Sequence, residues 1–197
     1  PDNQVIGQRS FGSDAQTVAG MVTSELQGLS AAGVYGMVKH FPGHGGTSGD
    51  SHDGAVSTDK TLEELMAEEL VPFQSAIDGG VNFVMVGHIS APNVTGDNAP
   101  ATLSKVLITD VLRGQMGYNG IVITDAMNME AITGFYNSDK AAVLAVTAGA
   151  DMILMPADYN TAYTGILNAV NDGTITEERI NESVTRIVKA KLAMGQP

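Results

Sequence analysis

The stretch G-I-V-I-T-D at residues 120–125 is a short, β-branched apolar run that ends in a carboxylate. Three other runs share its length and its apolar character, and each is followed by a loop. They are VYGMVKH at 34–40, VNFVMVGH at 81–88 and DMILMP at 151–156. Apolar runs of about four to eight residues that end at loops are typical of strands buried on both faces of a parallel sheet. We therefore predict four parallel strands.

Longer stretches of helical period separate these runs. We predict one helix over 61–80, where Thr61 and Glu64 have the spacing of a capping box, and a second helix over 104–117. A third helix is predicted over 176–192, because its apolar side chains fall on one stripe with charges opposite. These apolar side chains are Ile180, Val184, Ile187, Val188 and Leu192. We expect this stripe to pack against the rest of the fold.

The alternation of strand and helix predicts a parallel sheet with right-handed crossovers, either an open doubly wound sheet or a closed barrel. Three of the predicted strands end in polar side chains, at Lys39-His40, His88 and Asp125. In a barrel, such strand ends line one shared site. The loop after Phe41 fits neither G-x-G-x-x-G nor G-x-x-x-x-G-K-[ST]. The predicted fold is therefore α/β of the (β/α)8 TIM-barrel type, of which four strands make about half.

Composition narrows the classes of function. Ten Lys and Arg residues against 22 Asp and Glu give a formal net charge of −12. This charge argues against nucleic acid as a partner, because such binding depends on cations that neutralise phosphates. No run of about 18 apolar residues exists, so no membrane-spanning segment is predicted. The absence of Cys excludes disulfides, thiolate zinc sites and a cysteine nucleophile.

Asp125 is the first candidate for chemistry. An Asp that closes a strand often only caps the segment that follows it. Here, however, the next residues are A-M-N-M, at 126–129. Small and Met side chains predict an apolar floor around one carboxylate, which suits a nucleophile that attacks a carbon centre.

The second candidate lies in the glycine-rich stretch KHFPGHGGTSGDSHDG at 39–54. A histidine on such a loop is usually only solvated. The carboxylate of Asp50, however, lies two residues before His52, where it would accept the imidazole N–H, fix the tautomer and raise the basicity of the ring. His44 is separated from His52 by seven residues, which is not a metal-ligand spacing. We predict neither a catalytic metal nor another cofactor.

Several motifs together resemble the β-N-acetylglucosaminidases of glycoside hydrolase family 3, in the same order and over essentially the whole chain. They are V-I-G-Q-R-S-F-G at 5–12, K-H-F-P-G-H-G at 39–45, D-S-H at 50–52, P-A-T-L-S-K at 100–105, M-G-Y-N-G-I-V-I-T-D-A-M-N-M at 116–129 and G-A-D-M-I-L-M-P at 149–156. The β-glucosidases of that family lack the D-S-H loop. Its presence here therefore points to N-acetylated amino sugars.

The resemblance implies a bacterial retaining glycosidase that removes terminal β-linked N-acetylglucosamine, released from peptidoglycan-derived muropeptides during cell-wall recycling. Asp125 is then the nucleophile, and His52 is the general acid/base with Asp50 as its partner. Arg9, Lys39 and His40 are implied to bind the sugar. His88 is expected to join these substrate-binding residues because of its place at a strand end.

Two alternatives to hydrolysis stay open. Phosphate is a possible acceptor in place of water, since a neutral imidazole repels an anionic nucleophile less than a carboxylate does. The protein would then be a β-N-acetylglucosaminide phosphorylase. The other alternative is a catalytically silent sugar-binding half-barrel. The sequence also leaves open whether the protein is cytoplasmic or exported.

The resemblance further implies that residues 1–197 are the C-terminal part of a single catalytic domain, whose first half lies upstream. Four strands of an eight-stranded closure leave two unpaired sheet edges. We expect the missing N-terminal half, or a second copy of the chain, to cover these edges. The 197 residues alone are therefore expected to be inactive.

Overall fold

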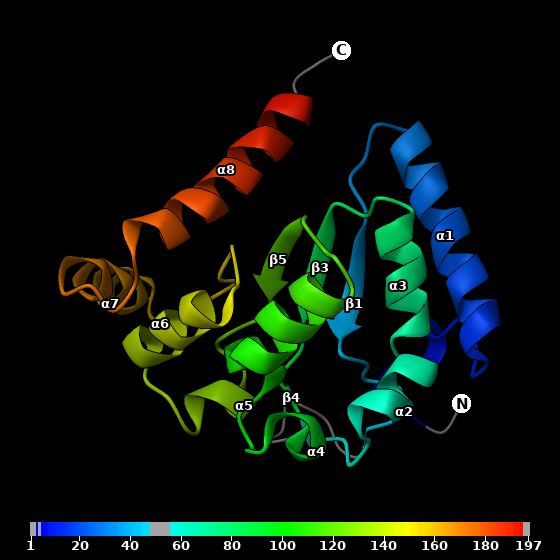
Figure 1. Cartoon of the computed structure of the whole chain (residues 1–197), viewed down its shortest axis with the longest axis horizontal. Coiled ribbons are helices and arrows are strands. Elements are labelled where there is room, and N and C mark those ends of the chain that lie inside the picture. The colour runs from blue at the N-terminus through cyan, green and yellow to red at the C-terminus, as the bar shows by residue number, and fades with distance from the viewer. Residues whose placement is uncertain (1–2, 4, 48–55, 195–197) are drawn as a thin grey trace.

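The structure, a computed structural model, describes residue 3 and residues 5–47 and 56–194. Its centre is a parallel sheet in the order β1-β3-β5, formed by β1 (Met37–Phe41), β3 (Phe83–Val86) and β5 (Ile121–Thr124) (Figure 1). A short second parallel pair joins β2 (Val56–Ser57) to β4 (Ile89–Ser90). Because β1, β3 and β5 run in the same direction, their carboxyl ends lie at one edge of the sheet.

The central strand β3 is buried on both faces, as its continuous apolar run predicts. Val84 and Val86 are fully buried, and Met85, which points to the opposite face, is 6% exposed. Neighbours in β1 and β5 flank this strand in register, with Phe83 opposite both Met37 and Ile121.

The fourth predicted strand, 151–156, lies beside β5 but is much shorter than predicted. Its pairing consists of one isolated parallel bridge between Ile123 and Met152. The N–H of Thr124 donates to the carbonyl of Met152 at 3.1 Å, whereas the N–H of Leu154 donates to the side-chain hydroxyl of Thr124 at 3.0 Å. Since this hydroxyl takes the place of a backbone acceptor, the regular ladder ends there.

Helices fill the connections between the strands. On one side, α1 (Ala15–Ala31) packs on α3 (Val71–Asp78), which lies next to β1; on the other side, α6 (Ser138–Ala148) packs on α7 (Tyr159–Asn171) (Figure 1). The other helices of the described part are η1 (Gly7–Arg9), α2 (Leu62–Ala67), α4 (Pro92–Thr95), η2 (Ala101–Leu103), η3 (Val106–Gln115), α5 (Glu130–Thr133) and α8 (Glu177–Met194). Within the described ranges, none of these helices combines the length and the apolar character needed to cross a membrane.

The helix predicted over 61–80 exists as two helices, α2 and α3. The capping box at its start is confirmed: Thr61 Oγ1 accepts from the N–H of Glu64 at 3.3 Å, and Glu64 Oε2 accepts from the N–H of Thr61 at 2.8 Å. The backbone leaves the helical conformation at Glu68, and Pro72 lies in the first turn of α3. A proline is tolerated in a first turn but not inside a helix, so it favours a new start here.

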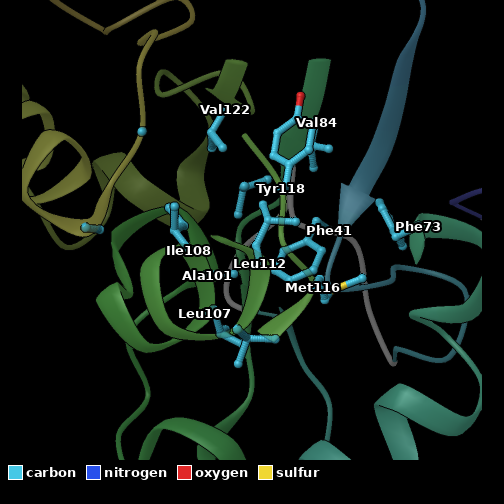
Figure 2. Packing of buried hydrophobic residues seen from close by; sticks show 14 of the residues in the cluster. Phe41, Phe73, Val84, Ala101, Leu107, Ile108, Leu112, Met116, Tyr118 and Val122 are labelled. Carbon is cyan, nitrogen blue, oxygen red and sulfur yellow. The ribbon is translucent and has the colours of Figure 1, made fainter. Parts of the chain in front are cut away.

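The main hydrophobic core packs the sheet against η3, a π-helix that confirms the helix predicted over 104–117. Figure 2 shows side chains of η3 grouped with those of the strands, namely Leu107, Ile108 and Leu112 with Phe41, Val84 and Val122. The rings of Phe41 and Phe73 meet edge to face, with centroids 5.5 Å apart. Burial of each such side chain contributes roughly 1.5–3 kcal/mol, so the core holds the strands that carry the candidate residues.

The helix predicted over 176–192 is confirmed as α8, but its apolar stripe packs as predicted only near its start. Ile180 contacts a small cluster with Val146, Ala169 and Ile175. Further along, Val184, Val188 and Leu192 are 48%, 44% and 64% exposed, although α8 stays beside the amino ends of the strands, where the hydroxyl of Tyr35 donates to the carbonyl of Ala190 at 3.1 Å. The reason is that α8 faces the sheet with polar groups: Ser183 is buried and donates to the carboxylate of Asp151 at 2.6 Å.

Candidate active site

The carboxyl ends of β1, β3 and β5 bring His40 and Asp125 together. Val86, the last residue of β3, lies opposite Phe41 of β1 and Thr124 of β5. The N–H of Asp125, one residue beyond β5, donates to the carbonyl of Val86 at 2.8 Å. Nε2 of His40 consequently lies 3.7 Å from Oδ2 of Asp125.

Gly87 makes this approach possible. A Cβ atom at Gly87 would lie 3.0 Å from the Cβ of His40 and 3.3 Å from the side chain of Ile89. Because glycine has no side chain, His40 packs over the end of β3. The pairing of β1 with β3 also shifts register between Val38 and Phe41, which is the kind of irregularity expected around adjacent polar residues on a strand.

The two oxygens of the Asp125 carboxylate have different surroundings. Oδ1 accepts the N–H of Ala126 at 2.8 Å, whereas Oδ2 faces His40. Among the described residues, the Ala126 N–H is the one hydrogen-bond donor to this carboxylate, and the side chain is 16% exposed. One oxygen is thus fixed by the backbone and the other is left available to a ligand.

His40 is held neutral near pH 7. Its residue exposure is 9%, and burial lowers the pKa of the imidazole to about 4, although the carboxylate of Asp125 opposes this effect. Positive charge from Lys39, His44 and Arg9 lowers the same pKa further. Nδ1 of His40 is buried and has no hydrogen-bond partner in the described part of the chain.

Arg9 and Lys39, both predicted to bind substrate, lie close enough to His40 for their charges to act on its pKa. Arg9 ends η1, where its guanidinium donates to the carbonyl of Val5 at 2.6 Å. Lys39 is exposed, whereas its neighbour His40 is buried. Two exposed cations therefore lie near His40.

His44 is a member of this group that the sequence reasoning considered only as a metal ligand. Its ring stands edge-on to the ring of His40, with centroids 5.7 Å apart, and its Nδ1 is 2.7 Å from Oγ1 of Thr47. The side chain of Asn3 donates to the carbonyls of His44 and Gly45 at 2.7 and 3.0 Å. The N-terminal segment thereby fastens the loop that follows β1. His44 could have been included among the candidate residues, because it belongs to the K-H-F-P-G-H-G motif at 39–45.

His88 is predicted to bind substrate, but the structure places it beneath the surface. It is 1% exposed. Its Nδ1 lies 2.8 Å from Oγ1 of Thr102, and its Nε2 lies 2.9 Å from the carbonyl oxygen of Ala126. The ring therefore contacts the turn that carries Asp125, and its role in substrate binding stays a prediction.

Asp50 and His52, the predicted acid/base pair, lie outside the described residues. In the ranges that are described, no three His, Asp or Glu side chains form a group that could hold a metal ion.

Two cavities formed by the described residues lie away from Asp125. One, of about 420 Å³, is lined by Met127 and by residues of α5, α6 and the start of α7. The other, of about 700 Å³, lies between α8 and the starts of β3 and β5. Neither includes Asp125 in its lining.

Candidate residues at the carboxyl ends of parallel strands fit the TIM-barrel class, and structural neighbours confirm this predicted fold class. The chain belongs to the glycosyl hydrolase family 3 N terminal domain family, which it matches over residues 1–190. The family resemblance recognised in the sequence motifs is therefore also confirmed.

Solved and curated relatives agree with this membership. The chain is similar to a glycoside hydrolase family 3 β-N-acetylglucosaminidase from Paenibacillus sp. str. FPU-7, with 44% identity, a TM-score of 0.94 and coverage of 98% of this chain and 37% of that chain. The β-hexosaminidase LpqI of Mycobacterium tuberculosis is 37% identical over 199 residues, or 97% of this chain and 50% of that protein. The β-glucoside phosphorylase BglX is 29% identical, with a TM-score of 0.92 over 98% of this chain and 36% of its own. This chain spans 36% to 50% of the length of the curated relatives it matches.

Proposed function

We propose that the protein is a retaining β-N-acetylhexosaminidase that removes terminal β-linked N-acetylglucosamine, and that Asp125 is its nucleophile. The observation that carries the proposal is the asymmetry of the Asp125 carboxylate. Oδ1 is fixed by the Ala126 N–H, and Oδ2 is free of protein donors in the described residues. A nucleophile needs an oriented oxygen with an unused lone pair, and this arrangement supplies one. The names of the curated relatives support the substrate class.

The proposed reaction has two steps. In the first, Oδ2 of Asp125 attacks the anomeric carbon, the glycosidic C–O bond breaks, and protonated His52 gives its proton to the leaving oxygen. In the second, neutral His52 takes a proton from water, whose oxygen attacks the anomeric carbon and releases Asp125. Asp50 orients the imidazole through its ring N–H. Retaining glycosidases usually place a second carboxyl about 5 Å from the nucleophile, and here the imidazole takes that role.

The surroundings of Asp125 support sugar binding. Nε2 of His40 lies 3.7 Å from Oδ2 of Asp125, so a sugar hydroxyl held beside Oδ2 also lies near a ring nitrogen that can donate or accept. Lys39 and Arg9 offer donors from the exposed side, close to His40. Because His40 is neutral near pH 7, it binds a hydroxyl without adding a fixed charge beside the nucleophile.

We further propose that the natural substrate is a muropeptide fragment in which N-acetylglucosamine is β-linked to a cell-wall amino sugar. The D-S-H motif at 50–52 and the bacterial hexosaminidases among the relatives support this choice. Comparable rates on β-glucosides and N-acetyl-β-glucosaminides would contradict it.

The proposal treats residues 1–197 as the C-terminal half of a catalytic barrel. In the described sheet, β1 pairs on one side only, and the segment at 151–154 pairs with β5 alone. Met37 on β1 is 42% exposed, and Val184, Val188 and Leu192 of α8 are exposed as well. An upstream half-barrel would cover these surfaces. We expect the 197 residues alone to show negligible turnover, and the complete protein that contains them to be active.

The decisive test uses an aryl N-acetyl-β-glucosaminide and the complete protein. We expect release of the aryl alcohol, and a glycosyl adduct on Asp125 in the intact mass when the second step is slow. His52→Ala should impair natural glycosides far more than aryl substrates, since only poor leaving groups need the proton. Equal losses on both substrates would contradict the acid role of His52. No turnover by the complete protein would instead support a sugar-binding domain.

A phosphorylase is the second candidate, favoured by the likeness to the β-glucoside phosphorylase BglX. The product identifies the acceptor. Hydrolysis gives free N-acetylglucosamine at a rate independent of phosphate, whereas phosphorolysis gives N-acetylglucosamine 1-phosphate at a rate that rises with phosphate concentration.

A further inference from the structure

His88 and Thr102 form a buried pair directly behind the proposed nucleophile. Thr102, at the centre of η2, is fully buried, and His88 follows β3 after one glycine. The carbonyl of Ala126 can only accept a hydrogen bond, so Nε2 of His88 must carry a proton. In the neutral ring, Nδ1 then accepts from the hydroxyl of Thr102 at 2.8 Å. Both ring nitrogens of His88 thus have a partner.

The Ala126 peptide links this pair to Asp125. Its carbonyl is held by His88, and the N–H of the same residue donates to Oδ1 of Asp125 at 2.8 Å. On either side of Ala126, the N–H groups of Asp125 and Met127 donate to the carbonyls of Val86 and Leu154 at 2.8 and 2.9 Å. Backbone bonds therefore fix the ends of the turn, and the side chain of His88 fixes its middle.

We propose that His88 is a positioning residue that holds the Ala126 peptide, and through it the Asp125 carboxylate, in the orientation that directs Oδ2 toward the sugar. This inference rests on the proposed role of Asp125 as nucleophile. Thr102 orients the ring of His88. If the Ala126 peptide rotates, Oδ1 of Asp125 loses its hydrogen-bond donor. The carboxylate can then turn, and Oδ2 is no longer held toward the sugar.

Displacing a reacting group by about 1 Å can cost on the order of 100-fold in rate, even when the substrate still binds. We therefore expect loss of the His88 contact to lower kcat by about 10- to 100-fold, with little change in KM.

Two amide substitutions separate the two ring nitrogens of His88. In His88→Gln the amide nitrogen reaches roughly the position of Nε2 and can still donate to the Ala126 carbonyl. In His88→Asn the shorter amide reaches the position of Nδ1, near Thr102, and leaves Ala126 unbound. We expect His88→Gln to keep most of the wild-type kcat and His88→Asn to lose it, although the two variants are similarly polar.

A second pair of variants tests Thr102 without touching the ring. Thr102→Val removes the hydroxyl at nearly the same shape, and Thr102→Ser keeps it. Thr109→Val is the control, since it removes a different threonine hydroxyl hydrogen bond, from Thr109 Oγ1 to the carbonyl of Ala148 at 2.7 Å, far from Ala126 in the sequence. We expect Thr102→Val to lower kcat, and Thr102→Ser and Thr109→Val to leave it within about twofold of wild type.

The measurements are kcat and KM on the aryl N-acetyl-β-glucosaminide, the rate of adduct formation on Asp125 by intact mass, and the melting temperature of the complete protein. A slower adduct with unchanged KM in His88→Asn and Thr102→Val supports the inference. A raised KM with unchanged kcat would show that His88 contacts substrate, and a loss in Thr109→Val equal to that in Thr102→Val would show general destabilisation; either overturns it. If the wild-type protein itself releases no aryl alcohol, the proposed function fails first, and that outcome is distinct from wild-type rates in the variants.

Discussion

Asp125 and Asp151 are two carboxylates that flank β5 and have opposite surroundings. Asp125 follows the carboxyl end of β5, is 16% exposed and accepts one hydrogen bond from the described chain, from Ala126. Asp151 lies near the start of the same strand, and its side chain is fully buried. Its donors are Arg113 at 2.6 Å, Ser183 at 2.6 Å, Val122 N–H at 2.9 Å and Arg186 at 3.0 Å.

The difference separates a carboxylate suited to react from one suited to hold the fold. Both oxygens of Asp151 are occupied, and Arg179 adds a third cation at 3.8 Å. Burial lowers the pKa of the Arg113 and Arg179 guanidinium groups, and the charge of Asp151 opposes this effect. The cluster joins η3, β5 and α8 through one anion. Asp125, in contrast, keeps Oδ2 available and contributes little to packing.

Asp125→Asn in the complete protein gives the largest expected effect. The amide cannot form the glycosyl-enzyme, so kcat on the aryl glycoside should fall by about 1,000-fold or more. The melting temperature should change little, because the one described hydrogen bond to the carboxylate can be kept by the amide oxygen. Asp110→Asn, on the exposed side of η3, is the control and should behave as wild type. Near-normal activity in Asp125→Asn would remove Asp125 from the mechanism.

Asp151→Asn should give the converse result. Removing the buried anion leaves three arginines without their shared partner, and breaking such a buried pair costs about 3–5 kcal/mol of unfolding free energy. We expect this loss in urea unfolding, with kcat per folded molecule nearly unchanged. An unchanged urea midpoint in Asp151→Asn would show that the arginines do not need the charge of Asp151. Asp151 would then not be the carboxylate that stabilises the fold, in contrast to Asp125.

His40 should make stability depend on pH. The folded pKa is about 4, while an unfolded histidine has a pKa of about 6.5, so the unfolded chain binds a proton that the folded chain does not between these values. Stability is therefore full above about pH 6.5, falls as the pH drops toward 4, and changes no further from this cause below that. The total is at most about 3.5 kcal/mol, at about 1.4 kcal/mol per pH unit.

The variant His40→Asn tests this dependence. Urea unfolding of wild type and variant at several values between pH 4 and 7 should show a shallower slope in the variant, while the two proteins differ by a constant amount above pH 6.5. Parallel slopes over the whole range would mean that His40 does not carry the effect.

Asp125 could be predicted from the sequence because its place needs only a strand pattern and a common strand direction. The Asp151 cluster could not, since its donors come from segments 29 to 38 residues away and meet through side-chain geometry. The same reasoning explains His88. The strand pattern predicts the strand end that carries His88, but its contact with the turn behind Asp125 also depends on Thr102, from another segment.

Periodicity likewise identifies apolar faces but not the groups that cover them. The sequence predicts the apolar stripe of α8 but not its exposure. Val188 is 44% exposed because Ser183 and the arginines of α8 direct the polar side of the helix toward Asp151. The shortened fourth strand has a similar cause, since one threonine hydroxyl replaces a backbone acceptor, a detail that no hydrophobic pattern contains.

The smallest expected effect is that of Arg186, the most exposed of the three arginines around Asp151, at 23% of its side chain. In Arg186→Gln, Oδ1 of Asp151 still accepts from Ser183, and Arg113 still neutralises the anion. We therefore expect a loss of only about 1–2 kcal/mol of unfolding free energy, with Arg186→Lys retaining part of it through its charge. Activity per folded molecule should not change. Chemical unfolding of the two variants beside Asp151→Asn measures whether the carboxylate shares its bonds among several donors. A loss in Arg186→Gln as large as that in Asp151→Asn would show that one donor carries the cluster, which would make Asp151 resemble Asp125 in its dependence on a single contact.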